Sequence, residues 1–145
     1  MTDGYFPQLA AERPDIALCR ASSAVARIGE AHARAAGLGT GPHLVLKMLA
    51  ERGPSSQRAL GEQLRIDRTV MVGVCDGLEE AGLVRRERDP ADRRAYAVTL
   101  TPAGRARLAE AERTVPALLD EALAPLNAQE RGQLSALLLK LVLPN

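Results

Sequence analysis

Aromatic side chains are almost absent from this sequence. It contains no Trp, and its aromatic residues are Tyr5, Phe6 and Tyr96. Proteins that bind single-stranded nucleic acids usually stack bases on aromatic side chains, so this shortage argues against that class. The core must be aliphatic instead, and 145 residues are enough for one domain with a sizeable core.

Cysteine and lysine are also scarce. Cys19 and Cys75 form no CxxC pair, so we expect no disulfide framework, no zinc or other metal site and no cofactor. Lysine occurs only at positions 47 and 140, so nearly every positive charge is an arginine, which a GC-rich genome is enough to explain. The formal net charge is only +1, so any anion-binding surface must be local.

A leader and a membrane segment are not apparent either. The opening segment MTDGYFPQLAAERPD has no basic start and no long apolar run, so we expect no signal peptide. The most apolar stretch, LSALLLKLVL, is too short to span a bilayer and contains Lys140. The sequence predicts a cytoplasmic protein without a membrane partner.

Helical patterns fill most of the chain. Residues 1–14 are expected to be irregular because they contain Gly4, Pro7 and Pro14. Caps and apolar spacing predict three helices in the first part of the chain: over 16–36 after Asp15, over 42–51 after Thr40, and from a Ser55 or Ser56 cap to 64. Three more are predicted after them: over 67–81 from Asp67, over 102–123 after Thr101, and from Asn127 onward. The helix over 102–123 is expected to bend at Pro116.

The helix over 67–81 has the clearest apolar face. Met71, Val74, Cys75 and Leu78 follow the i, i+3, i+4, i+7 spacing of a buried stripe. In the long helix over 16–36 the stripe is weaker and runs through Ile16, Cys19, Ser23, Ala26 and Ala33.

A β-hairpin follows the helix over 67–81. Its first strand begins at Leu83-Val84, and the return strand AYAVTL is expected to turn Tyr96, Val98 and Leu100 inward. The segment Asp89-Pro90-Ala91-Asp92 between the strands is typical of a turn.

Two short helices joined by a tight turn and followed by a hairpin are typical of a winged helix-turn-helix. The predicted fold is therefore mainly α with a small β-hairpin wing. The second helix, 67–81, is expected to enter the major groove of duplex DNA, with outward-facing residues Arg68, Thr69, Val72 and Gly73. The start of the preceding helix is expected to contact the DNA backbone through Ser55, Ser56, Gln57 and Arg58.

The hairpin over 84–100 is predicted to form the wing. An arginine on its turn can enter a narrow minor groove, where the negative potential is high. The candidate wing residues are Arg86, Arg88, Asp92, Arg93 and Arg94, and Asp92 can hold one guanidinium by a charge-assisted hydrogen bond. A mixed-charge hairpin can also be plain solvated surface, but the helix pair directly before it favours DNA binding.

The segment Gln57–Gly104 resembles the multiple antibiotic resistance regulator (MarR) family of bacterial transcription factors. The resemblance rests on LGEQL, on IDRTV followed by DGLEEAGLVRR, and on RDPADRRAYAVTLTPAG. It implies one domain over 1–145, in which the winged helix, 42–100, lies between dimerisation helices at 15–36 and 102–143. It also implies a homodimer on a pseudo-palindromic operator, repression in most cases, and a small aromatic or phenolic effector in a crevice beside the DNA-binding part. In the family's wing, the residues that correspond to Asp92 and Arg94 pair, and the arginine enters the minor groove.

One departure from the family concerns sequence reading. Members usually carry a polar residue and an arginine in the middle of the recognition helix, where this chain has Val72-Gly73. Neither residue makes bidentate hydrogen bonds to bases, so base reading is expected to depend on Arg68 and Thr69.

Alternatives remain open for the ligand residues and for the function. Arg20 and His43 are candidates to line the effector crevice, or they are ordinary surface residues. Cys19 is either a ligand-site or redox-sensing thiol or a small buried core residue. A winged-helix module for protein–protein contact is a second hypothesis. An enzyme is disfavoured, because no catalytic or phosphate-binding constellation occurs.

Overall fold

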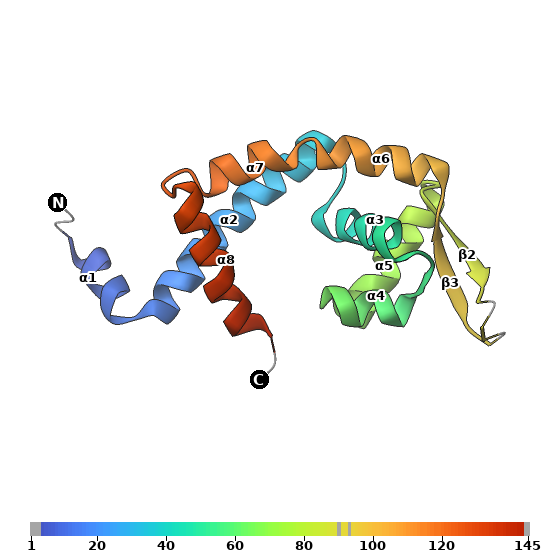
Figure 1. Ribbon diagram of the computed structural model, residues 1–145, viewed down its shortest axis with the longest axis horizontal. Coiled ribbons are helices and arrows are strands. Elements are labelled where there is room, and N and C mark those ends of the chain that lie inside the picture. The colour runs from blue at the N-terminus through green and yellow to red at the C-terminus, as the bar shows by residue number, and fades with distance from the viewer. Residues whose placement is uncertain (1–3, 90, 93, 144–145) are drawn as a thin grey trace. The chain divides into compact units, whose positions relative to one another are not determined.

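The computed structural model describes residues 4–89, 91–92 and 94–143. Its contacts divide the chain into two compact units, residues 30–115 and residues 1–29 with 116–145. The helices and strands of both units are labelled in Figure 1. The predicted fold class is confirmed: the chain is mainly helical with one small antiparallel sheet.

The unit over 30–115 contains the helix pair and the sheet. After the end of α2 (Pro14–Ala36) it runs through α3 (Thr40–Arg52), β1 (Ser55–Ser56), α4 (Gln57–Leu64), α5 (Arg68–Glu80), β2 (Val84–Arg88), β3 (Tyr96–Leu100) and α6 (Pro102–Glu112). The strand order is β1-β3-β2, with Ser56 opposite Ala97 and Arg86 opposite Val98. The sheet thus has a third strand that was not predicted.

A single aliphatic core holds this unit together. Helix α3 contributes Val45, Leu46 and Leu49, and Leu60, Val84, Val98 and Leu108 come from the elements around it. The predicted stripe of α5 is confirmed, since Met71, Cys75 and Leu78 are buried and Val74 packs against the cluster. In β3 the prediction is wrong at Tyr96, a residue that is 55% exposed, while Ala97 and Val98 are both buried.

A close turn joins α4 to α5. Arg65 adopts the left-handed conformation with φ 55°, and the N–H of Ile66 donates to the Gly61 carbonyl at 3.0 Å. A Cβ at Gly61 would lie 3.1 Å from the Ile66 carbonyl oxygen, so the turn leaves little room for a larger residue. This packing sets the two helices of the helix-turn-helix against each other (Figure 1).

Several predicted caps are confirmed and others are wrong. Ser56, Thr101 and Asn127 accept hydrogen bonds from the first turns of α4, α6 and α8 (Ala128–Val142), and Asn127 forms the expected capping box with Glu130. Asp67 stands at the N-cap of α5 without a capping hydrogen bond. Two further caps lie inside their helices: Thr40 is the first residue of α3, and Asp15 follows Pro14 at the start of α2, where its carboxylate pairs with Arg13 at 2.7 Å.

In its described residues the second unit contains helices and their connections and no strand. A short helix α1 (Tyr5–Glu12) replaces the predicted irregular segment, because Pro7 lies in its first turn, where a missing N–H costs no hydrogen bond. The predicted helix over 102–123 is interrupted: α6 ends at Glu112 and α7 (Val115–Ala122) follows. Arg131 of α8 pairs with Asp120 at 2.9 Å and donates to the Leu123 and Leu126 carbonyls.

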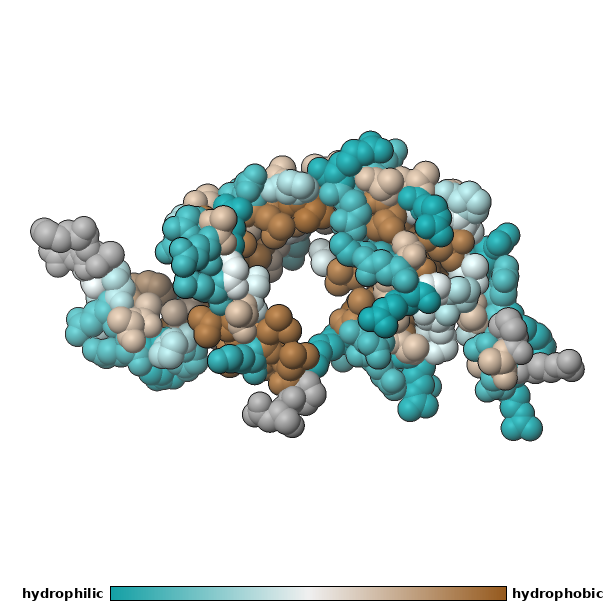
Figure 2. Space-filling model, viewed as in Figure 1, coloured by the Kyte–Doolittle hydropathy of each residue, from teal (hydrophilic) through white to brown (hydrophobic). Residues whose placement is uncertain are grey.

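The second unit has an uncovered apolar surface. Of the described residues, none in α1, α2, α7 or α8 is buried. Figure 2 shows apolar surface at the C-terminal end of α8, where the exposed residues are Leu137, Leu139, Leu141, Val142 and Leu143. Cys19 is exposed too, so its interpretation as a buried core residue is wrong for the single chain. Among the residues described, we find no helix long and apolar enough to cross a membrane.

Candidate nucleic-acid interface

The outward face of α5 lies opposite its buried stripe. Arg68 and Thr69 are exposed in the first turn, and Val72 and Gly73 follow in the next, with the Val72 side chain 42% exposed. A Cβ at Gly73 would meet nothing within 4 Å, so the backbone is accessible there. All four predicted recognition-helix residues are therefore placed on the surface, as a contact with a base edge requires.

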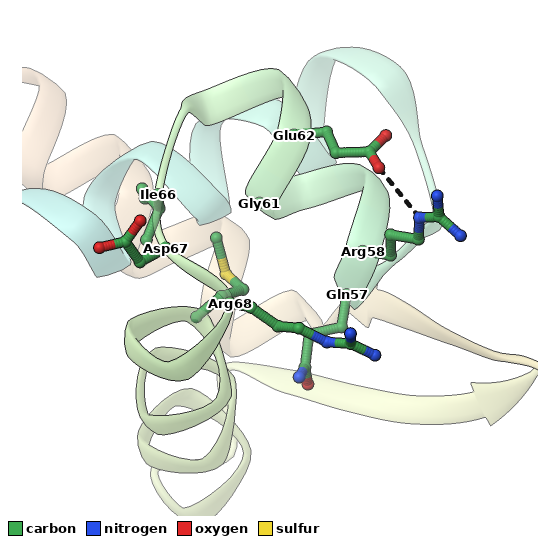
Figure 3. A pocket seen from close by; sticks show the side chains of 8 residues that line it. Gln57, Arg58, Gly61, Glu62, Ile66, Asp67 and Arg68 are labelled. Carbon is green, nitrogen blue, oxygen red and sulfur yellow. Dashed lines mark hydrogen bonds and ion pairs between the residues drawn. The ribbon is translucent and has the colours of Figure 1, made fainter.

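A groove separates the start of α5 from α4 (Figure 3). It has a volume of about 630 Å³, and Arg58 and Arg68 line it from the two helices. Arg58 also pairs with Glu62 at 2.9 Å on the exposed side of α4. The Asp67 carboxylate points away from the Arg68 guanidinium in Figure 3, so it leaves the positive side of the groove open to an anion.

The serines before α4 serve the local backbone. The Ser56 hydroxyl accepts the Ala59 N–H at 3.0 Å, and the Ser55 hydroxyl donates to the Gly53 carbonyl at 3.0 Å. Both residues also form β1, which pairs with β3. Their position at the start of a helix remains suited to a phosphate, but the side chains have structural partners already.

Arg86, in the middle of β2, forms hydrogen bonds with three side chains from other elements. Its guanidinium donates to Gln57 Oε1 at 3.0 Å, to Asp76 Oδ1 at 2.6 Å and to Glu79 Oε1 at 3.2 Å. Its backbone N–H donates to Glu79 Oε2 at 3.1 Å. Partial burial lowers the pKa of Arg86, but the hydrogen bond with Asp76 and the charge of Glu79 outweigh it and raise the pKa, so the guanidinium stays charged.

The tip of the wing is held by backbone hydrogen bonds. Asp92 Oδ1 accepts the backbone N–H of Arg94 at 3.0 Å, and the N–H of Asp89 donates to the Ala95 carbonyl. Among the described residues, Asp92 and Arg94 form no side-chain ion pair, and the Arg94 side chain is exposed. Arg93, the other predicted arginine of the tip, lies outside the described residues. Arg88 lies with its guanidinium carbon 5.7 Å from the centre of the Tyr96 ring.

The base of the wing is closed by the segment Leu100-Thr101-Pro102-Ala103-Gly104. The Thr101 hydroxyl donates to the Gly82 carbonyl at 2.7 Å and accepts the Gly104 N–H at 3.0 Å. The Thr101 N–H donates to the Leu83 carbonyl at 3.1 Å. These bonds join the entry to β2, the end of β3 and the start of α6, so this segment sets where the wing leaves the core.

The three candidate ligand residues lie in different places. Cys19 and Arg20 are exposed on α2 in the unit that contains residues 1–29. His43 lies on α3 in the other unit, where its Nε2 is 3.4 Å from Glu112 Oε1. Lys47 Nζ lies 3.1 Å from the same oxygen, so Glu112 already bridges two side chains of α3.

A second groove runs along α5 beside the N-terminal end of α3. It has a volume of about 710 Å³, and its lining is mostly apolar: Leu38, Pro42, Val70, Val74, Leu78 and Leu83 surround Gly73 and Gly77. Arg107 is the one charged residue among the described residues of the lining, and its guanidinium donates to the Ala36 carbonyl. The groove can take a flat apolar molecule in contact with the recognition helix.

Sequence reasoning missed two features of this surface. Asp76 and Glu79 were not linked to Arg86, although their spacing of three residues places both on one side of α5. The partners Gln57 and Glu112 lie far from Arg86 and Lys47 in the sequence, and no local pattern identifies such pairs.

The fold and this surface define a winged helix-turn-helix protein. A model of the MarR family matches residues 36–95. Over 105 residues the chain is 37% identical to a putative transcriptional regulatory protein for the hcr operon of Thauera aromatica, a match that covers 72% of this chain and 63% of that protein. The matched region thus spans less than two thirds of that relative.

Solved structures agree over nearly the whole chain. A probable transcriptional regulator from Pseudomonas aeruginosa is similar with a TM-score of 0.79 and 34% identity, covering 88% of this chain and 96% of that one. BpsR of Bordetella bronchiseptica, whose DNA binding is regulated by 6-hydroxynicotinic acid, is similar with a TM-score of 0.84 and 29% identity, covering 90% and 94%. The chain belongs to the MarR family of transcriptional regulators, and these relatives are regulators rather than enzymes.

Proposed function

We propose that the protein is a homodimeric, ligand-responsive DNA-binding repressor that recognises a pseudo-palindromic operator with α5 and the wing. The observation that carries the proposal is the exposed face of α5, which begins with Arg68 and Thr69 beside a β-hairpin with Arg94 near its tip. A helix in the major groove and an arginine in the minor groove are the two contacts that such a unit makes. The proposal includes a cytoplasmic location, where a bacterial chromosome is found.

Base reading is assigned to the first turn of α5. Arg68 can donate two hydrogen bonds to guanine, and the Thr69 hydroxyl can bond to several bases. Val72 offers a methyl group to thymine, and Gly73 lets the DNA approach the backbone. Because the middle of the helix lacks a bidentate donor, much of the affinity is expected to come from phosphates and from Arg94.

The homodimer is supported by the surface of the second unit. Its described helices bury no residue within the single chain, and α8 exposes four large aliphatic residues, with Leu143 exposed directly after it. A folded protein does not usually leave so much contiguous apolar surface in water. A second copy that covers this surface would also place two winged helices on two operator half-sites.

The effector is proposed to be a small aromatic or phenolic compound. BpsR, a relative, is regulated by 6-hydroxynicotinic acid, which is of this class. The apolar groove beside α5 is a candidate site, because a molecule there would press on Val70 and Val74 of the recognition helix. Hydroxylated benzoic, cinnamic and pyridine carboxylic acids that raise the melting temperature of the wild type should fail to do so for Gly77→Leu, which fills the groove.

The test of DNA binding is fluorescence anisotropy with the DNA upstream of the protein's own gene and a scrambled duplex of equal length. The upstream DNA should bind more tightly, and log K should fall with log salt. Arg94→Ala should weaken binding and reduce the slope by about one unit, the share of one phosphate contact. Equal binding to both duplexes, or no binding, would favour the protein–protein interaction module instead.

A further inference from the structure

Arg86 joins three elements of the winged helix through one guanidinium. It lies in the middle of β2, and its partners are Gln57 at the start of α4 and Asp76 and Glu79 on α5. Its side chain is 26% exposed, whereas that of Asp76 is 60% exposed. The Arg86 side chain is therefore more buried than the Asp76 carboxylate that it binds, and the carboxylate lies closer to the solvent.

The neighbouring arginine on the same strand has a different environment. Among the described residues, the ion-pair partner of Arg85 is Glu87, at 3.4 Å, and the Arg85 side chain is 63% exposed. Successive residues of a strand point to opposite faces, so Arg85 cannot reach α5 while Arg86 does. Arg86 therefore makes a specific contact with α5, which a basic residue elsewhere on the strand, such as Arg85, does not provide.

We propose that Arg86 is a positioning residue, which fixes the wing against the recognition helix and cancels the charge of Asp76, and that it does not contact DNA. This differs from its place among the predicted DNA-binding residues, and it rests on the proposed function for its effect on operator binding. The ligand whose binding depends on this arrangement is duplex DNA, which α5 and the wing contact together in the proposed function.

The first consequence of the bonding concerns geometry. β2 pairs only with β3, so its outer edge leaves backbone groups without a strand partner. At this edge Glu79 Oε2 accepts a hydrogen bond from the backbone N–H of Arg86, and Glu79 Oε1 accepts one from the Arg86 guanidinium. The carboxylate of α5 therefore binds backbone and side chain of the same wing residue, which fixes both the distance and the rotation between helix and strand.

The second consequence concerns charge. Asp76 lies on the exposed side of α5, one turn beyond Val72 and Gly73, where an unpaired carboxylate would repel phosphates. The hydrogen bond of 2.6 Å to Arg86 pairs this charge within the protein. Three of the five guanidinium N–H donors of Arg86 are bonded to protein side chains, and a phosphate that used these donors would have to displace Gln57, Asp76 or Glu79.

The test is a double-mutant cycle of Arg86→Gln and Asp76→Asn, with Arg85→Gln as the matched control. Arg85→Gln removes the same charge from the same strand without touching α5. Affinity for the operator and its dependence on salt are measured for each variant by anisotropy, and circular dichroism checks that each is folded. All variants are compared at one protein concentration.

Arg86→Gln should weaken operator binding about tenfold and leave the salt slope within half a unit of the wild type. In the Asp76→Asn background the same change should cost about threefold or less, because position 76 then carries no charge that could repel phosphates. Arg85→Gln should show no such coupling. A slope smaller by about one unit, or equal losses in both backgrounds, would show that Arg86 binds phosphate directly and would overturn the proposal.

A measurement without DNA separates this proposal from the proposed function. If the wild type bound no DNA, the proposed function would fail, and the link between wing and helix would still be testable. Urea unfolding of the wild type, of the three single variants and of the two double variants that combine Asp76→Asn with Arg86→Gln or Arg85→Gln should then show coupling between positions 86 and 76 and none between 85 and 76. Additive effects at 86 and 76 would refute the link itself.

Discussion

Gly104 offers the sharpest test of how the wing is attached to the core. A Cβ at this position would overlap the Leu83 carbonyl oxygen and lie 2.7 Å from Leu100 Cδ1. The carbonyl cannot move aside freely, because it accepts the Thr101 N–H at 3.1 Å at the entry to the wing. Gly104→Ala must therefore displace the first turn of α6 from the start of β2.

The cost can be estimated from the contacts that would be lost. Displacement breaks the Thr101–Leu83 bond and the Gly104–Thr101 bond, each with a net contribution of about 1 kcal/mol. Overpacking beside Leu100 adds about 1–3 kcal/mol. The better helix propensity of Ala returns about 1 kcal/mol, so the free energy of unfolding should fall by about 2–4 kcal/mol.

The assay is urea unfolding followed by circular dichroism at a fixed protein concentration. The matched control is Gly77→Ala, also within a helix, where a Cβ would meet nothing within 4 Å. This variant should gain about 0.5–1 kcal/mol from helix propensity alone. If Gly104→Ala were as stable as the wild type, the close approach of α6 to Leu83 would be wrong, and so would the account of how the wing is held.

Two further predictions concern base reading and pH. Thr69→Ala should change which half-site is preferred more than it changes total affinity, as measured by anisotropy with single-base operator variants; a uniform loss would mean that Thr69 touches phosphate only. The hydrogen bond from Lys47, with a smaller effect of His43, lowers the pKa of Glu112. A lowered carboxyl pKa stabilises the folded state above the unfolded value of about 4.3, and this stabilisation disappears as the pH falls through the lowered value. Glu112→Gln should therefore be less stable than the wild type at pH 7, by under about 1 kcal/mol, and equally stable near pH 3, as measured by thermal unfolding; a constant difference would contradict this.

Local signals allowed much of the fold to be predicted. The buried stripe of α5 and the caps at Ser56, Thr101 and Asn127 depend on residues within one turn of each other, so the sequence contains them directly. The strand β1 was missed because two serines carry no apolar pattern, and only pairing with distant Ala97 and Val98 makes them a strand.

Long-range packing also explains why two other features could not be predicted: which side chains of β3 face the core, and the role of Arg86. Alternation placed Tyr96 inward, but both Ala97 and Val98 are buried, and the Tyr96 ring lies beside Arg88 instead. In the sequence, nothing distinguishes Arg86 from the other basic residues of the predicted wing. Its partners come from α4 and α5, and only the packing of the sheet against these helices brings them within hydrogen-bond distance.

The distribution of buried residues suggests how binding and dimerisation are related. Among the described residues, every core side chain belongs to the unit over 30–115, which carries α4, α5 and the wing. The other unit exposes several leucines, among them Leu137, Leu139 and Leu141, and depends, in our proposal, on a second copy. Variants that weaken the dimer should therefore lose operator affinity while each winged helix keeps its own core.

The central claim is that two winged helices act together on one operator, and a hydroxyl-radical footprint on the upstream DNA tests it most directly. The account predicts two protected regions related by a pseudo-twofold axis, with centres about one helical turn, roughly 10 base pairs, or a multiple of it apart. Arg94→Ala should remove the protection of the minor groove beside each half-site. Protection of a single half-site, or of none at a concentration that saturates anisotropy, would contradict it.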